Sequence, residues 1–217
     1  MRRSRGFVGV LFDWDGVLLD SLGASFRVYN RILGRLGSEA LTQDEFMRFQ
    51  SPNWYEFYAK LGIPENLWKT VDGEWVRLYK EEKTGLHHDA LPCLMRLRAS
   101  GFKLALVSNG SKARVETELA RFKLVPVFQS VTCGEKKEEL KPSPVMLERT
   151  VRRLGLRASD VVYVGDAPAD VQAAMNAGVV SVAIAREPII EGRLRAENPD
   201  YVFGGLKEMA DFLIEAK

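Results

Sequence analysis

Cysteine is scarce in this sequence, and its spacing excludes two classes of protein. Of the 217 residues only two are cysteines, Cys93 and Cys133, and they form no CxxC pair. A disulfide-rich scaffold needs more cysteines, and a cysteine-based zinc site needs closely spaced ones. We therefore expect two ordinary reduced thiols, and no pattern supports a disulfide between them.

The sequence also lacks a long apolar run and an excess of charge of either sign. No run is long enough to cross a bilayer, and 31 basic against 29 acidic residues give a formal charge of +2. This balance gives no reason to expect nucleic acid or an anionic membrane as a partner. The basic start resembles a signal peptide, but its apolar part is short and the charged Asp13 follows it. We expect a soluble cytoplasmic protein.

What the chain does contain is short, valine-rich apolar runs that alternate with amphipathic helical patterns. The runs cover residues 7–12, 104–107, 161–164, 179–184 and, late in the chain, 200–205. The helical patterns cover residues 111–122, 143–154 and 168–178, and a closing helix has Met209, Phe212 and Leu213 inward. Ser143 is expected to cap the second helix and Gly178 to follow the end of the third. The alternation predicts an α/β fold, a Rossmann-like three-layer core with a parallel sheet.

Residues 21–88 break this alternation and contain no convincing strand. Four helical stripes follow one another there, bounded by Gly37, by the capping box TQDE at 42–45, by Ser51 and Pro52, and by Pro64. Three of the four tryptophans lie in this segment, and Trp68 and Trp75 are expected in its core. We therefore expect a core of residues 1–20 and 89–217 with an inserted α-helical cap domain at 21–88.

Polar side chains follow the ends of several predicted strands. In open α/β sheets, ligands bind beyond the carboxyl ends of the strands. The residues found there, or in the neighbouring loop ELKPSP, are Asp13, Asp15, Ser108, Asn109, Lys141, Asp166 and Asp170. Each of them alone is explained as a turn residue, a helix cap or a solvated side chain. Together, at one edge of one sheet, they predict a functional site.

Four motifs in these loops carry a resemblance to a known superfamily. DWDGVLLDS, VSNG, KPSP and GDAPAD follow one another along the chain, and they resemble the four motifs of the haloacid dehalogenase-like superfamily in its phosphatase branch. The helical insertion after the first motif is similar to the superfamily's cap of the first type, and its length most resembles that of phosphoglycolate phosphatases. The resemblance implies a Mg²⁺-dependent phosphatase for a small phosphorylated metabolite, phosphoglycolate-like or a sugar phosphate.

By this resemblance, Asp13 is the nucleophile and becomes an aspartyl phosphate. An aspartate nucleophile divides a very slow hydrolysis into two easier steps. Mg²⁺, which prefers a few carboxylates plus water and phosphate oxygen, neutralises charge where nucleophile and phosphate meet. Its expected ligands are Asp13, Asp166 and the backbone carbonyl of Asp15, while Asp170 binds a metal-bound water or orients Lys141.

Asp15 is the expected general acid and base. The leaving alkoxide needs a proton and the attacking water must lose one, and one carboxyl group can do both in sequence. This requires a protonated Asp15 beside an ionised Asp13, which a metal would hold as its anion. Alternation along an extended segment would send both side chains the same way around Trp14. Dehalogenases resemble this chain but lack a carboxylate at this position, so Asp15 favours phosphoryl chemistry.

The remaining core motif residues are expected to bind the phosphate. Gly16 lets the backbone approach the phosphate closely. Ser108 and Asn109 offer hydrogen-bond donors to its oxygens, and Lys141 adds a point charge that stabilises the reacting group.

The insertion is expected to set the substrate. Asn53 and Trp54 are the candidates for contact with the leaving group, although the alternative is that this stretch simply starts a helix with Trp54 in the core. A sugar phosphomutase of the β-phosphoglucomutase type is an alternative function, but such members commonly carry a histidine where this chain has Ser25. A phosphonate hydrolase needs a desolvated cap lysine for a Schiff base, and Lys60 is the candidate considered.

A non-catalytic member that binds phosphate or a protein partner is a further alternative. It is disfavoured because the motif aspartates are all present. The neighbouring His87 and His88 do not share a helix or strand face, so a metal pair is not expected. We favour a monomer, and a homodimer through the cap is left open.

Overall fold

The computed structural model describes residues 6–49, 51 and 53–217, and its centre is a sheet of six strands. The strand order is β5-β4-β1-β6-β7-β8, and every pairing is parallel. The strands are β1 (Gly9–Phe12), β4 (Lys103–Ser108), β5 (Ser130–Cys133), β6 (Val161–Gly165), β7 (Val180–Ile184) and β8 (Tyr201–Phe203). The predicted α/β fold with a parallel sheet is confirmed, although β5 was not predicted.

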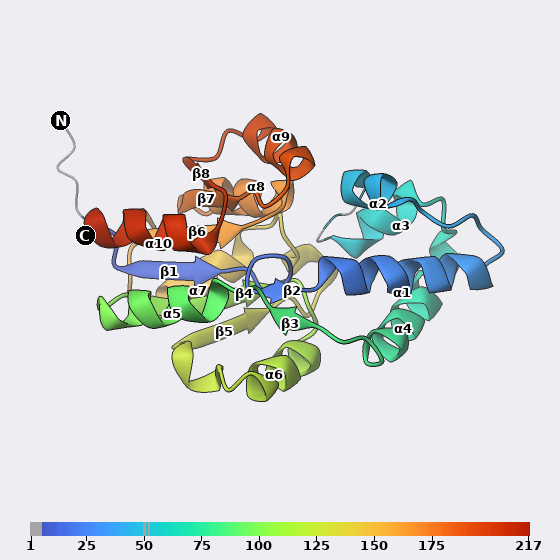
Figure 1. Cartoon of the computed structure of the whole chain (residues 1–217), viewed down its shortest axis with the longest axis horizontal. Helices are drawn as coiled ribbons and strands as arrows, with labels where there is room; N and C mark the ends of the chain where they lie inside the picture. Colours follow the sequence, from blue (N-terminus) through green and yellow to red (C-terminus); the bar gives the residue numbers. More distant parts are fainter. Residues whose placement is uncertain (1–5, 50, 52) are drawn as a thin grey trace.

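Helices cover both faces of this sheet (Figure 1). On one face lie α5 (Ala90–Ala99), α6 (Lys112–Arg121) and α10 (Leu206–Glu215), and on the other lie α7 (Val145–Leu154), α8 (Pro168–Asn176) and α9 (Pro188–Ala196). In β1, Val10 and Phe12 pack into the first apolar layer and Leu11 into the second. A strand that is covered on both faces is therefore apolar throughout, as the sequence pattern indicates.

Of two predicted helix ends, the structure confirms the end of α8 and corrects the start of α7. Gly178 follows α8 with a φ of +65°, which is the left-handed conformation expected of a glycine after a helix. The expectation of Ser143 as N-cap is wrong by one residue, since α7 begins at Val145 and Pro144 occupies the cap position. Short 3₁₀ turns are η1 (Glu65–Leu67), η2 (Val125–Val127), η3 (Lys137–Glu139) and η4 (Ala158–Asp160).

The segment of residues 21–88, called the insertion from here on, forms a group of helices beyond one end of the sheet (blue to cyan in Figure 1). They are α1 (Leu22–Arg35), α2 (Gln43–Phe49), α3 (Trp54–Lys60) and α4 (Trp68–Tyr79). The capping box before α2 is confirmed, because the backbone amide of Glu45 donates to Thr42 Oγ1 and that of Thr42 donates to Glu45. The third helix begins at Trp54, and Pro52 lies outside the described residues.

The chain leaves and re-enters the core through two short strands that lie side by side. β2 (Leu19–Asp20) and β3 (Gly85–Leu86) pair antiparallel. The expectation that residues 21–88 contain no strand is therefore wrong at β3, because a strand of two residues is too short to show an alternating pattern. Among the helices of the described residues, none combines the length and the apolar character needed to cross a membrane.

Candidate active site

The loop after β1 turns two carboxylates towards a cavity and buries the tryptophan between them. Trp14 is fully buried in the core, and its indole Nε1 donates a hydrogen bond of 2.6 Å to Glu118. Asp13 and Asp15 both line the cavity. The two aspartates are therefore turned to the same side around Trp14, as the alternation of an extended segment predicts.

The cavity has a volume of about 320 Å³ and lies between the carboxyl ends of the strands and the insertion. Most of the predicted site residues line it: Asp13, Asp15, Ser108, Asn109, Lys141, Asp166 and Trp54. Residues that are distant in sequence thus meet at one edge of the sheet, where the fold class predicts a ligand site.

Three aspartates and one lysine form a buried cluster at this edge. Carboxylate oxygens of Asp13, Asp166 and Asp170 lie within 4.8 Å of one another, and all three residues are buried. The Lys141 side chain is 0% exposed, and its Nζ lies 2.8 Å from Asp13 and 2.5 Å from Asp170. Tyr163 donates a hydrogen bond of 3.0 Å to Asp170. Asp170 is thus placed against Lys141.

The electrostatics of the cluster reflect burial of like charges. Burial raises the pKa of Asp13 to about 7, against the attraction of Lys141. Burial, with Asp170 and Asp13 nearby, also raises the pKa of Asp166 well above its usual range. Burial would lower the pKa of Lys141, but the two neighbouring carboxylates outweigh it and raise that pKa.

This cluster fits a divalent cation. If all three carboxylates are ionised, the single ammonium leaves two negative charges in a buried space, and such charges are costly unless they are paired. Carboxylate oxygens are hard donors of the kind that Mg²⁺ prefers. The donor set and its charge therefore suit Mg²⁺ better than a soft metal ion.

Gly16 allows the backbone to pass beside this cluster. Its φ is +79°, and a Cβ atom built there would lie only 1.9 Å from Oδ2 of Asp166. A larger residue would therefore collide with Asp166 in addition to straining the backbone. The structure shows a close approach of Gly16 to a carboxylate of the cluster, and the expected approach to a phosphate stays a prediction.

Ser108 and Asn109 hold the loop after β4 in place. The backbone amide of Gly110 donates to Ser108 Oγ at 2.9 Å, and the backbone amide of Lys141 donates to Asn109 Oδ1 at 2.9 Å. Asn109 therefore ties the loop of the third motif to that of the second. Both residues line the same cavity as Asp13.

Arg114 of α6 was not predicted as a site residue, yet it holds Asp15. Its Nη1 and Nη2 donate to the two carboxylate oxygens of Asp15 at 3.0 and 2.5 Å. It also pairs with Glu118 at 3.1 Å and lies over the rings of Tyr79 and Trp75 at 5.2 and 5.8 Å. An arginine on an amphipathic helix is ordinarily solvated, and its partner here is 99 residues away, so the sequence carried no local signal.

The Arg114 contact alters the protonation order that the sequence predicts. Burial would raise the pKa of Asp15, but the Arg114 guanidinium outweighs it and holds that pKa below its usual value. The charge of Arg114 thus favours an ionised Asp15, whereas burial raises the pKa of Asp13. A protonated Asp15 beside an ionised Asp13 therefore requires a cation at Asp13 and separation of Asp15 from Arg114.

The candidate residues of the insertion have different positions. Trp54 lines the cavity, whereas Asn53 stands at the start of α3 and donates to Glu56 at 3.0 Å. Among the described residues that line the cavity, Asn53 is not present. Trp75, expected in the helical core, packs there and also faces the cavity. Lys60 is exposed on α3, which disfavours a Schiff-base lysine.

The adjacent histidines lie at the re-entry of the chain into the core. The backbone amide of His87 donates to Leu18 at 2.9 Å, and His88 is exposed. Neither belongs to the one group of metal-type side chains found in the described part of the chain.

Comparisons with known proteins show the family of this chain. Residues 10–184 match the family model of haloacid dehalogenase-like hydrolases. Pyrophosphatase PpaX of Bacillus mycoides is 27% identical over 214 residues, 94% of each chain. A phosphoglycolate phosphatase of Pseudomonas savastanoi is 29% identical over 216 residues, which cover 92% of this chain and 77% of that protein. A haloacid dehalogenase-like hydrolase of Streptococcus pneumoniae shares the fold, with a TM-score of 0.84 at 17% identity over 95% of this chain and 98% of that one. The resemblance predicted from the four motifs is confirmed, and the chain belongs to the haloacid dehalogenase-like hydrolase family.

Proposed function

We propose that this protein is a Mg²⁺-dependent phosphatase that hydrolyses the phosphate monoester bond of small phosphorylated metabolites. The reaction passes through an aspartyl phosphate on Asp13. The observation that carries the proposal is the buried cluster of Asp13, Asp166 and Asp170 around Lys141, which opens onto a cavity of about 320 Å³. The pyrophosphatase and phosphoglycolate phosphatase among the relatives support removal of phosphate from a small molecule.

The proposed reaction has two steps with balanced bonds and protons. In the first, an oxygen of Asp13 bonds to phosphorus as the ester P–O bond breaks, and Asp15 gives its proton to the departing oxygen. In the second, Asp15 takes a proton from water, the water oxygen bonds to phosphorus, and the bond to Asp13 breaks. One ester and one water become one alcohol and one phosphate.

Lys141 and a Mg²⁺ ion held by the carboxylates would supply the positive charge that this reaction needs. Lys141 lies 2.8 Å from Asp13, so its ammonium stands beside the reacting carboxylate and the phosphate that binds there. Asp13, Asp166 and the backbone carbonyl of Asp15 would hold Mg²⁺, which when bound supplies positive charge to the phosphate oxygens. Asp170 keeps Lys141 in position.

Arg114 bears on both roles of Asp15. The pair found here keeps Asp15 ionised, which is the form that accepts a proton from water. The first step needs the protonated form, so Asp15 must leave Arg114 before it. Because Arg114 also lies over Tyr79 and Trp75 of the insertion, movement of the insertion as a cap about β2 and β3 would change this contact.

The position of Ser25 favours hydrolysis over a sugar phosphomutase. Ser25 lines the cavity, so this position of α1 does face the site. A hydroxyl there has no titratable group with which to exchange protons near neutral pH, unlike the histidine common in β-phosphoglucomutase-type members.

The experiment that tests the proposal traps the phosphoenzyme. We would mix Asp15→Asn with p-nitrophenyl phosphate and Mg²⁺ and quench the reaction with acid. The protein would then be digested, and the masses of its peptides measured by mass spectrometry. This leaving group needs no proton, so the first step proceeds while loss of the base slows the second. We expect one phosphoryl group on the peptide that contains Asp13, and none in Asp13→Asn. A burst of p-nitrophenol without phosphoryl on that peptide would overturn the mechanism.

A further inference from the structure

The wall that the insertion contributes to the cavity is rich in aromatic side chains. Six of its twelve described lining residues carry rings: Tyr29, Phe46, Trp54, Phe57, Tyr58 and Trp75. Tyr29 meets Phe57 edge to face with ring centroids 4.6 Å apart, and Trp75 stacks on Tyr79 at 4.4 Å. Rings that pack against each other in this way lose little further freedom when a flat apolar group binds beside them.

The cations that line the cavity are already paired. Among the described lining residues, only Lys141 and Arg114 are basic, and both come from the core rather than from the insertion. Lys141 contacts Asp13 and Asp170, while Arg114 contacts Asp15 and Glu118. When Asp15 leaves Arg114, as the first step of the proposed reaction requires, Glu118 remains as a carboxylate partner of Arg114. Neither cation is therefore left without a carboxylate partner to meet a second anionic group on the leaving side of a substrate.

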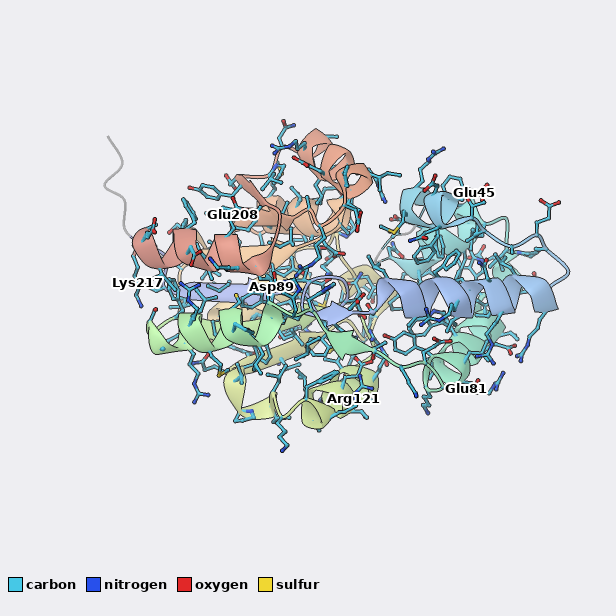
Figure 2. All side chains as sticks on the ribbon, in the orientation of Figure 1. Glu45, Glu81, Asp89, Arg121, Glu208 and Lys217 are labelled. Atoms are coloured by element: carbon cyan, nitrogen blue, oxygen red, sulfur yellow. The ribbon has the colours of Figure 1, made fainter. Side chains whose placement is uncertain are left out.

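The arginines of α1 and α4 are directed away from the cavity. The ion pairs they form are Arg27 with Glu82, Arg31 with Glu81, and Arg35 and Arg77 with Glu74. Figure 2 shows Glu81 at the outer surface of the insertion. These arginines are 41% to 55% exposed, so their positive charges lie in ion pairs that face solvent.

The charge that the insertion does place in the cavity wall is negative. Among the described lining residues of the insertion, Asp72 of α4 is the only charged one. It accepts a hydrogen bond of 2.7 Å from the hydroxyl of Tyr58. A carboxylate or second phosphate on the leaving group would be buried opposite Asp72 without a free cation, and this is unfavourable.

Two indole groups in the wall still have a hydrogen bond to give. Nε1 of Trp54 and Nε1 of Trp75 are buried, and neither has a hydrogen-bond partner in the described part of the chain. A buried donor without an acceptor is costly. Both unsatisfied donors belong to side chains that line the cavity.

From these observations we propose a substrate class, which rests on the proposed phosphatase function. The cavity takes monoesters whose leaving alcohol is uncharged and carries an aromatic or similarly broad apolar group. Compounds with an anionic leaving side, such as the ester phosphoglycolate and the anhydride pyrophosphate, are poor substrates of this chain. It therefore differs in substrate from the relatives that are named for those two compounds.

A matched pair of substrates tests this proposal. Benzyl phosphate and phosphoglycolate are both esters of a primary alcohol, and they differ by a phenyl ring in place of a carboxylate. We expect kcat/KM for benzyl phosphate to exceed that for phosphoglycolate by about 100-fold or more, because the carboxylate loses its hydration without gaining a cation. Equal values, or a preference for phosphoglycolate, would overturn the proposed class and leave the phosphatase function intact.

A charge placed in the wall provides the second test. Val76 of α4 lines the cavity and is 42% exposed, so Val76→Lys can bring an ammonium to it without burying one in the core. We expect the preference for benzyl phosphate to fall by about 10-fold or more. Val125→Lys is the matched control, because Val125 is 56% exposed in η2 and does not line the cavity. An equal effect of both substitutions would contradict the proposal.

A binding measurement separates failure of the substrate class from failure of the proposed function. Trp54 and Trp75 line the cavity, so a bound ligand should change tryptophan fluorescence. We would titrate Asp13→Asn, with Mg²⁺, with benzyl phosphate and with phosphoglycolate. If neither compound is turned over by the unsubstituted protein, tighter binding of benzyl phosphate still supports the aromatic site. Equal or weaker binding of benzyl phosphate overturns it.

Discussion

Replacement of Lys141 by methionine should destabilise the protein strongly when divalent cations are removed. Lys141 has 0% exposed side chain, and its Nζ contacts Asp13 at 2.8 Å and Asp170 at 2.5 Å. Methionine fills a similar volume, so the main change is the loss of charge. Two carboxylates would then stay buried beside Asp166 without their ammonium.

The expected size follows from this burial. Removal of one partner from a buried ion pair costs about 3–5 kcal/mol, since the other charge is left unpaired. For a chain of this length, each kcal/mol lowers the melting temperature by about 2–4 °C. Lys141→Met should therefore melt about 6–20 °C below the unsubstituted protein, measured by circular dichroism at neutral pH in EDTA.

A surface ion pair of similar geometry serves as the control for this prediction. Lys207 lies 2.9 Å from Asp211, but its side chain is 79% exposed. Because water and salt screen such a pair, Lys207→Met should change the melting temperature little. A Lys141→Met protein that melts within about 2 °C of the unsubstituted one would refute the reasoning that burial makes this lysine structurally indispensable.

Two further predictions concern stability and access to the site. Asp89, at the start of α5 (Figure 2), accepts hydrogen bonds from Arg186 and from the backbone amide of Leu206, the first residue of α10. Burial would raise the pKa of Asp89, but these partners hold it below 3.8. The contribution of ionised Asp89 to the free energy of unfolding is thus fully present above pH 3.8 and lost below it. Asp89→Asn should lower the free energy of unfolding by about 1.5–3 kcal/mol at neutral pH. Urea unfolding should show that this difference shrinks on acidification below about pH 4. Gly16→Ala should abolish Mg²⁺-dependent phosphate release, because the new Cβ collides with Asp166. Gly37→Ala, at a φ of +72° with open space around it, should strain the backbone equally and keep activity. Equal activity of the two glycine variants, or an Asp89→Asn effect that does not depend on pH, would contradict these expectations.

The sequence predicted the parts of the site that follow directly from strand ends. Apolar runs identified the strands β1, β4 and β6, and the polar residues after them meet in one cavity. Asp13 and Asp15 were placed on one side of Trp14 because side chains alternate along an extended chain. β5 was missed because Ser130–Cys133 is short and includes a serine and a threonine, so it shows neither a continuous apolar run nor a long alternation.

The parts that were missed depend on contacts between distant elements. Arg114 meets Asp15 across 99 residues, and the position of α6 beside the first motif is set by packing of the whole core. Whether Asp72 and Trp75 of α4 line the cavity depends likewise on how the insertion packs against the sheet. Amphipathic periodicity leaves this packing undetermined. The residues that meet at the strand ends were therefore predictable, whereas their partners and the character of the cavity wall needed the three-dimensional arrangement.

The central claim is tested most directly by release of inorganic phosphate from a panel of small phosphomonoesters and pyrophosphate. Each compound would be assayed with Mg²⁺ and with EDTA, and Asp13→Asn would be assayed beside the unsubstituted protein. We expect release that requires Mg²⁺ and disappears in Asp13→Asn, since the proposed nucleophile and a proposed metal ligand are lost together. Release that persists in Asp13→Asn, or a folded protein that releases no phosphate from any compound with Mg²⁺, would contradict it.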